Sequence, residues 1–135
     1  MFKKIFLLTC LYAIALICRG QDNIDSLKRI LQIKTQDDSS KIEILLQLGK
    51  NYLDTDPDTA ILYAKQAKDI AAKIDYKRGL AFALKDIGVG QFYQGHFVET
   101  LGNWEQSLLY FDSIGDRSNV ARLLSNIGAV YINNG

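Results

Sequence analysis

Side chains that could carry catalytic or metal chemistry are few in this chain. It contains one histidine, His96, and two cysteines, Cys10 and Cys18. A zinc site needs several ligands at short spacings, and nucleophilic catalysis needs a base beside the nucleophile. No motif places a partner for His96, and the sequence has no glycine-rich phosphate loop or nucleophile elbow. We therefore expect no enzyme activity and no metal or cofactor, and we expect His96 to be a solvated loop residue.

The acidic run at 54–58 has the residue types that begin a calcium-binding loop. An EF-hand loop also needs glycine at its sixth position and glutamate at its twelfth. Those positions hold Thr59 and Lys65 in this sequence. Asp56-Pro57 instead suits a helix start, with the aspartate as N-cap and the proline as the first helical residue. We interpret the run as a turn followed by a helix cap.

Basic residues do not form a nucleic-acid signature. The chain has 16 Lys and Arg against 15 Asp and Glu, a net charge of +1. This balance gives no electrostatic attraction to a polyanion. Lys65, Lys68 and Lys73 have the spacing of an ordinary polar helix face. We expect a protein or peptide partner and no nucleic acid, and a membrane contact only through a segment downstream of this sequence.

The segment at 1–20 has the pattern of a secretory signal. Lys3 and Lys4 precede an apolar run at 5–17 that only one threonine interrupts. This run is shorter than the roughly 20 residues that span a bilayer. Cleavage after Gly20 would leave small residues at the positions that a signal peptidase reads. We expect the segment 1–20 to be a signal peptide and the mature chain to be periplasmic or extracellular.

A lipoprotein signal acylated at Cys18 is the alternative. That signal needs a small residue before the cysteine, and Ile17 is bulky, so we favour simple cleavage. The mature part 21–135 then has 13 basic and 15 acidic residues, a net charge of −2, and no cysteine. Disulfides cannot stabilise it, although export would permit them. Its stability must come from packing.

A motif with the spacing Leu-x-x-Leu/Ile-Gly-x-x-Tyr/Gln occurs three times. The sequence separation between successive motif glycines is 39 and then 40. Apolar residues spaced by three and four positions share one stripe of a helix, and no segment of useful length alternates as a strand does. These features predict an all-α protein. The three copies are Leu45–Tyr52, Leu84–Gln91 and Leu124–Tyr131.

A second helical pattern occurs twice, and its period is 40. The separation of 39 between the first two motif glycines therefore reflects a one-residue deletion between Tyr52 and Ala60. The pattern places Trp104 on a core stripe, where an aromatic ring would fill the space between helix pairs. Its two copies are Ala60, Ala64, Ala67, Ala71 and Ile74, then Thr100, Trp104, Ser107, Phe111 and Ile114.

Capping residues mark the helix ends. Ser40 and Glu43 have the spacing of a capping box, in which two side chains satisfy backbone donors reciprocally. Gly95 and Gly135 suit left-handed C-caps. The predicted helices span 23–34, 40–54, 57–74, 77–94, 97–114 and 117–133.

The repeated glycines predict how the helices pack. A glycine inside a helix lowers helix stability by about 1 kcal/mol relative to alanine. Three glycines at the same position of the motif therefore indicate a structural role. Without a side chain, that turn lets a neighbouring helix approach closely. We expect Gly49 to face Ala60 and Gly88 to face Thr100. Each unit is then an antiparallel helix pair stacked on the next, which is a solenoid.

These residues resemble the tetratricopeptide repeat family. The match consists of Leu/Ile-Gly-x-x-Tyr on the first helix of each pair, Gly95-x-Phe97 at the turn, and small or aromatic residues at 60, 104 and 67 on the second helix. The period of 40 exceeds the usual 34 and is similar to a longer-helix subclass found in peptide-binding adaptors and bacterial sensor regions. Departures are Gln91 for tyrosine, Thr100 for alanine, and a first turn that is one residue short.

The resemblance implies a helix-pair solenoid of about two and a half repeats. Residues 21–39 would form an N-terminal capping helix and loop, followed by repeats at 40–76 and 77–116 and an incomplete repeat at 117–135. No second helix follows the third motif, so we expect the sequence to be an N-terminal fragment of a longer protein. We also expect the side chains that would face this helix to be exposed: Leu124, Ile127, Val130 and Tyr131.

The resemblance also implies a binding surface, because the concave face of such repeats is lined by their first helices. Lys50, Lys85 and Arg122 on this face could receive a partner's carboxylate. Asn126 matches a position where the family often has an asparagine that bonds peptide backbone. The alternative is that these side chains only keep an exposed helix face soluble. The predicted groove comprises Lys50, Phe82, Lys85, Asp86, Val89, Arg122 and Asn126, with Glu43, Leu46, Gln47, Phe92, Ser125 and Ala129 on the same face.

Two functions fit these expectations. The first is an exported repeat module that binds a peptide or protein partner in its concave groove. The alternative is the extracytoplasmic input region of a larger membrane signalling protein, such as a sensor histidine kinase or a nucleotide cyclase, with its catalytic part beyond residue 135.

Overall fold

The computed structural model describes residues 23–134. The predicted signal peptide, Cys10, Cys18 and the predicted cap Gly135 lie outside the described residues. Residues 23–134 contain helices and no strand, which confirms the all-α class. None of the helices in this range is long and apolar enough to cross a membrane.

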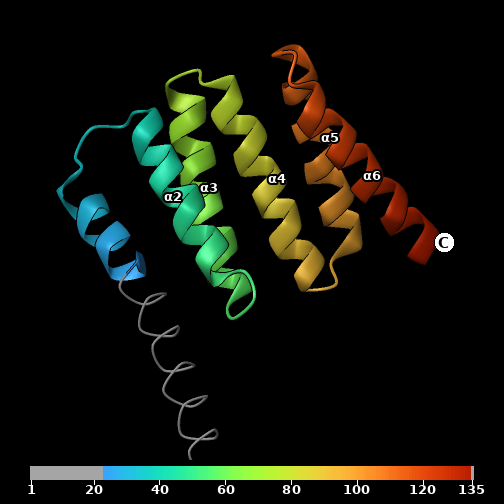
Figure 1. The fold of residues 1–135 in the computed structure, drawn as a ribbon, viewed down its shortest axis with the longest axis horizontal. Helices are drawn as coiled ribbons and strands as arrows, with labels where there is room; N and C mark the ends of the chain where they lie inside the picture. The colour runs from blue at the N-terminus through green and yellow to red at the C-terminus, as the bar shows by residue number, and fades with distance from the viewer. Residues whose placement is uncertain (1–22, 135) are drawn as a thin grey trace, which may run out of the picture. The chain divides into compact units, whose positions relative to one another are not determined.

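The chain divides into two units, 1–34 and 35–135. The first contains a helix over residues 23–33. The second contains five helices that are close to the predicted ranges (Figure 1). They are α2 (Ser39–Tyr52), α3 (Pro57–Lys73), α4 (Lys77–Tyr93), α5 (Phe97–Ser113) and α6 (Arg117–Asn134).

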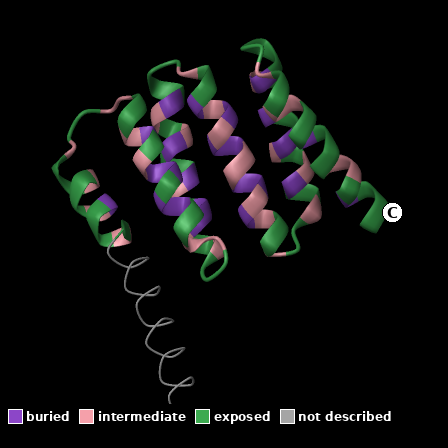
Figure 2. Cartoon of the chain, in the orientation of Figure 1, coloured by how far each residue is buried: buried purple, intermediate pink, exposed green. Residues whose placement is uncertain are grey.

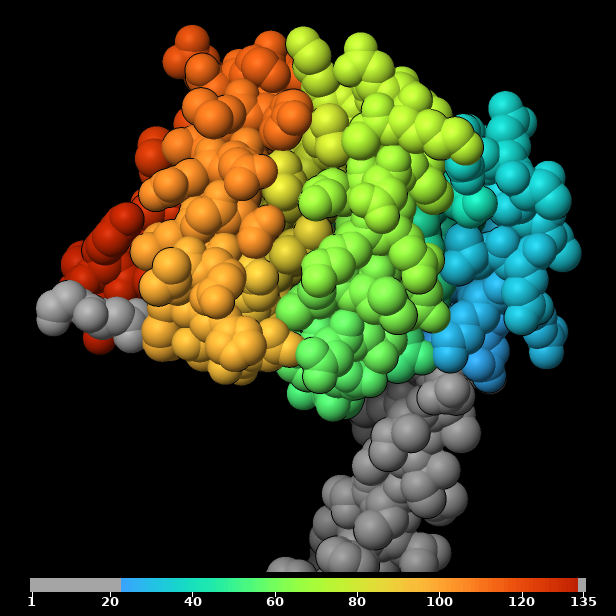
Figure 3. Space-filling model, turned by 180° about the vertical axis from the view of Figure 1, so that it is seen from behind, coloured from blue at the N-terminus to red at the C-terminus, as the bar shows by residue number. Residues whose placement is uncertain are grey.

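The five helices of the second unit pack in chain order. Each helix contacts the next, and α2 also contacts α4. Neighbouring helices run in opposite directions, so α2 and α4 share one direction and one face of the layer (Figure 1). The opposite face is formed largely by α3 and α5 (Figure 3). This is the packing expected of a helical-repeat arrangement.

Three equivalent turns set the helix lengths. Asp75, Gly95 and Gly115 are evenly spaced along the chain and have positive φ angles of 52°, 76° and 71°. In each turn the next backbone N–H donates to a carbonyl five residues earlier, as His96 does to Gln91 at 2.9 Å. This is the Schellman C-cap. The cap predicted at Gly95 is confirmed, and the same cap recurs at two positions that the sequence did not predict.

The first turn differs from the prediction of a shortened loop. Its loop, at 53–56, is one residue longer than the loop at 94–96. The shortening lies in the helix, because α2 ends three residues after Gly49 whereas α4 ends five residues after Gly88. The helix is thus two residues shorter and the loop one residue longer, which gives the net deletion of one residue. No positive φ closes this turn; Asp56 caps the next helix instead.

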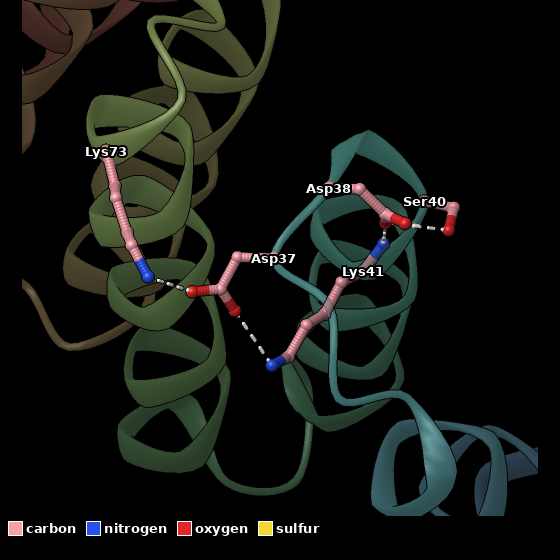
Figure 4. A network of polar contacts seen from close by, with 5 residues as sticks. All are labelled: Asp37, Asp38, Ser40, Lys41 and Lys73. Atoms are coloured by element: carbon pink, nitrogen blue, oxygen red, sulfur yellow. Dashed lines mark hydrogen bonds and ion pairs between the residues drawn. The ribbon is translucent and has the colours of Figure 1, made fainter.

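Aspartates cap three helices: Asp38 caps α2, Asp56 caps α3 and Asp116 caps α6. Asp56 accepts a hydrogen bond from the Thr59 backbone N–H at 3.1 Å with Pro57 beside it, which confirms that prediction. The predicted capping box at Ser40 is wrong. Asp38 is the N-cap of α2 and accepts from the Lys41 backbone N–H at 2.9 Å (Figure 4). An ionised aspartate is a stronger acceptor than a serine hydroxyl, so the helix begins before Ser40.

A second aspartate ties the loop before α2 to α3. Asp37 accepts hydrogen bonds from Lys41 at 2.9 Å and from Lys73 at 2.6 Å (Figure 4). These two ammonium groups lower the pKa of Asp37, with the Lys73 hydrogen bond contributing most. Lys73, assigned from the sequence to a polar face, therefore also links α3 to this loop.

Two of the three repeated glycines, Gly49 and Gly88, lie at close helix contacts, as predicted. A Cβ at Gly49 would lie 3.1 Å from the Ala60 carbonyl oxygen. A Cβ at Gly88 would lie 3.2 Å from the Thr100 carbonyl oxygen and would overlap the indole of Trp104. Trp104 is buried, which confirms its core position. The bulk of this ring is possible only because Gly88 has no side chain.

Helix α6 packs against α5 with one stripe of its side chains, and most of the surface of α6 is exposed (Figure 2). Leu124 and Tyr131 are 51% and 57% exposed, as expected. The expectation is wrong for Val130, which is 3% exposed because it packs in the core cluster with Trp104 and Phe111. Ile127 is partly buried against the same cluster.

Candidate functional site

A cleft of about 500 Å³ lies between α2 and α4. We call it the α2/α4 cleft. Its floor is apolar, with buried Ile42 and Leu46. Its rim carries both signs of charge, from Glu43, Lys50 and Arg78. The cleft is lined by Ile42, Glu43, Leu46, Gln47, Lys50, Tyr76, Arg78, Gly79 and Phe82.

Phe82 is the aromatic centre of this cleft. The Arg78 guanidinium lies 5.1 Å from its ring centroid, and Lys85 Nζ lies 4.8 Å from it. Phe111 contacts the ring edge-to-face, with 5.0 Å between the ring centroids. The cation–π contacts hold two basic groups over an apolar surface, where a carboxylate of a ligand could reach them. Arg78 is also 3.6 Å from Asp116, the cap of α6.

Asp86 lies one helical turn after Phe82 on α4. Its Oδ1 is 3.3 Å from Lys85 Nζ, and the carboxylate side chain is only 14% exposed. Its Oδ2 is buried and has no hydrogen-bond partner among residues 23–134. Burial raises the pKa of Asp86, whereas the nearby charges of Lys85 and Lys50 lower it by less.

A small cavity of about 20 Å³ lies against Asp86. This volume is enough for about one water molecule, which could hydrogen-bond the free carboxylate oxygen. The cavity lies among α2, α3 and α4. It is lined by Gly49, Lys50, Leu53, Ala60, Asp86 and Val89.

A second cleft of about 330 Å³ lies among α4, α5 and α6. We call it the aromatic cleft. Phe92 stacks on Trp104 with 6.0 Å between ring centroids, and it meets Phe97 at 5.7 Å. The α6 wall is aliphatic and carboxamide in character. The lining residues are Val89, Phe92, Phe97, Trp104, Asn126, Ala129, Val130 and Asn133.

The two clefts contain nine of the thirteen residues that the sequence placed on the predicted face. Lys85 contacts Phe82 beside the α2/α4 cleft, and Asp86 lines the small cavity. Arg122 and Ser125 are exposed on α6 and line neither cleft. The nine are Glu43, Leu46, Gln47, Lys50 and Phe82 in the first cleft, and Val89, Phe92, Asn126 and Ala129 in the second.

Five further polar or aromatic residues line the clefts but were not predicted as site residues. Arg78 and Asn133 follow the same helical register, one turn before Phe82 and one turn after Ala129, so the spacing could have identified them. Tyr76, Phe97 and Trp104 come from the turns and from α5. Their access to the clefts depends on how the helices pack, which the register of a single helix does not contain.

The other candidate residues have structural surroundings. His96 is exposed at the start of α5, and its side chain makes no capping bond to residues in the described part. The run at 54–58 forms the turn and cap around Asp56, whose pKa is lowered by its hydrogen bonds from Thr59. Within residues 23–134 there is no group of three or more His, Cys, Asp or Glu side chains that could hold a metal ion.

Both clefts present side chains suited to reversible contact with a polypeptide, namely apolar and aromatic surfaces with carboxamides, and the α2/α4 cleft adds separated charges. Comparisons with protein-family models, curated proteins and solved structures find no match to this chain.

Proposed function

We propose that this chain is an exported, tetratricopeptide-type repeat module that binds an extended segment of a protein or peptide across α2, α4 and α6. The observation that carries the proposal is the location of the two clefts. Both are lined by residues of the face that the resemblance to tetratricopeptide repeats implies for ligand binding, and these residues come from all three helices of that face.

The size and chemistry of the clefts support a peptide as ligand. Volumes of about 500 and 330 Å³ accommodate a few side chains each. Buried Ile42 and Leu46 provide apolar contact, and Gln47 and Asn126 provide hydrogen bonds to a backbone. Such a combination of an apolar floor and a polar rim is typical of peptide-binding grooves.

Charge supports a partner with acidic residues. Lys50, Arg78 and Lys85 lie in or beside the α2/α4 cleft, and Arg122 lies on α6. The predicted mature chain carries a net charge of −2. These four basic groups outnumber the acidic Glu43, Asp86 and Asp116 near them, on an otherwise slightly acidic molecule, which favours encounter with an acidic segment.

Charge reversal tests the proposal. A random peptide library is selected on the full chain, and the affinities of the selected peptides are measured for the chain and its variants. We expect Lys50→Glu combined with Arg122→Glu to weaken binding by about tenfold or more, because each change replaces attraction by repulsion. Lys65→Glu, an exposed change on α3, is the control and should leave affinity unchanged.

Both residues are exposed, so neither change should unfold the chain; helical circular dichroism checks this. Equal affinities for the double variant and the control would contradict a basic groove. Failure to select any peptide would contradict the proposed function as a whole.

A further inference from the structure

The aromatic cleft differs chemically from the α2/α4 cleft. None of the described residues that line it carries a charge, whereas Glu43, Lys50 and Arg78 surround the other cleft. Its polar groups are the side chains of Asn126 and Asn133, which lie two turns apart on α6. An uncharged pocket with carboxamides selects an apolar group next to a peptide backbone.

The walls of this cleft expose aromatic surface. Phe92 is 41% exposed although it stacks on Trp104, with ring planes inclined by 24°. Phe97 closes the same side, inclined by 64° to Phe92. The three rings and the aliphatic side chains of Val89 and Val130 leave a volume of about 330 Å³. A large planar or branched apolar side chain would cover these rings and exclude water from them.

Helix α6 provides the opposite wall. Toward its C-terminal end it runs away from α4 and α5 in Figure 1, and Ala129 lines the cleft there. Lys85 and Arg122 lie one helical turn before Val89 and Asn126 respectively. The exposed Arg122 therefore lies beside one end of the uncharged pocket on α6, whereas the Lys85 ammonium lies over Phe82 and against Asp86.

We propose that the aromatic cleft binds a large apolar side chain, phenylalanine or leucine in size, from a partner segment that carries an acidic residue near it. Asn126 and Asn133 bond the backbone beside this anchor, and Arg122 attracts the acidic residue. This inference rests on the proposed function and names the chemistry that one part of the groove selects.

The chain offers a direct reporter of this cleft. Trp104 is its only tryptophan and lines the cleft. A random library of short peptides is selected on the full chain, and tryptophan-free peptides from it are titrated while the fluorescence of Trp104 is followed. We expect enrichment of Phe or Leu next to Asp or Glu. Binding should change the Trp104 emission, and replacing the anchor by alanine should weaken affinity about ten- to a hundredfold.

Filling the cleft provides the matched variant. Ala129→Phe places a ring in the pocket from an exposed position and should abolish both the fluorescence change and the preference for an apolar anchor. Ala72→Phe makes the same change at an exposed position of α3 and should have no effect. Asn133→Ala, which adds no bulk, should weaken binding by several-fold. Melting curves of the three variants report that each is folded.

The outcomes separate the two proposals. Peptides that bind without an apolar anchor, or that bind Ala129→Phe as well as Ala72→Phe, would overturn the anchor and leave the groove intact. If no peptide binds, both proposals fail. Light scattering tests whether a second copy covers the cleft: dimers that Ala129→Phe disrupts would also overturn the assignment to a peptide.

Discussion

Asp86 brings a carboxylate into the contact between α2 and α4, where water reaches little of it. Lys85 contacts one oxygen at 3.3 Å, and the other oxygen is buried without a hydrogen-bond partner in the described residues. Burial disfavours the charged form and raises the pKa of this group. A buried charge that is only half satisfied is normally a cost to stability.

Asp86→Asn tests this cost. Because the folded state raises the pKa of Asp86, it binds a proton more tightly than the unfolded state does. The penalty is therefore present at neutral pH and disappears as the pH falls through the raised pKa toward the ordinary value of 3.8. We expect the asparagine variant to melt at a higher temperature than the parent at pH 7, and the difference to shrink as the pH approaches 4.

The control is Asp69→Asn, an exposed change on α3. It removes the same charge without removing a buried carboxylate, so the melting temperature should stay nearly constant. A lower melting temperature for Asp86→Asn at pH 7 would show that the ion pair with Lys85 outweighs the burial of the charge.

Close helix contacts at two of the repeated glycines, Gly49 and Gly88, help explain how the elements stack. Gly88 and Gly128 occupy the same place in the sequence motif, yet their surroundings differ. A Cβ at Gly88 would overlap Trp104, whereas a Cβ at Gly128 would meet no described atom within 4 Å. The same substitution should therefore have opposite effects at the two sites.

We expect Gly88→Ala to lower the free energy of unfolding by about 1–3 kcal/mol, because the added methyl group displaces the indole and the α5 backbone. Gly128→Ala should raise it by about 0.5–1 kcal/mol, the gain in helix propensity alone. Urea denaturation of both variants measures these changes. A loss of stability from both substitutions would contradict the contact geometry at Gly128.

The three Schellman turns give a second prediction at the scale of elements. Asp75 adopts a positive φ of 52° where the equivalent turns have Gly95 and Gly115. An aspartate tolerates this conformation less well than glycine does. Asp75→Gly should raise the free energy of unfolding by about 0.5–1 kcal/mol, and Gly115→Ala should lower it by about 1–2 kcal/mol. Thermal and urea melts test both signs, and a destabilised Asp75→Gly would show that the side chain contributes more than the strain costs.

Local patterns were sufficient to predict most of the helices. The periodicity placed the helix ends close to those observed, because the apolar stripes and the caps at Asp56 and Gly95 are short-range signals. Competition between neighbouring caps was not predictable: Asp38, rather than Ser40, begins α2. The left-handed Asp75 was missed because aspartate gives a weaker turn signal than glycine.

The register predicts which residues share one face of α2 and α4, whereas it does not predict the clefts between the helices. Residues one turn apart on α4, such as Phe82 and Asp86, must share a face. The aromatic cleft depends on the contact of Trp104 with Gly88 and on the divergence of α6 from α5. Both features depend on packing between helices. For the same reason, the burial of Val130 against α5 was not foreseen.

At the scale of the molecule, α2 and α4 lie on one face of the helical layer, and α3 and α5 form most of the other (Figures 1 and 3). The two larger clefts open among α2, α4 and α6, with α5 contributing to the floor of the second. A ligand that spans both clefts would contact the three helices of one face and leave the outer surfaces of α3 and α5 free.

Nuclear magnetic resonance can map where a peptide binds on these helices. The backbone amides of the isotope-labelled chain are followed while the tightest selected peptide is added. We expect shift changes concentrated at the predicted groove positions of α2, α4 and α6, including Gln47, Phe82 and Asn126, with little change at exposed α3 positions such as Lys65 and Ala72. Changes centred on the outer surfaces of α3 and α5 would contradict this expectation.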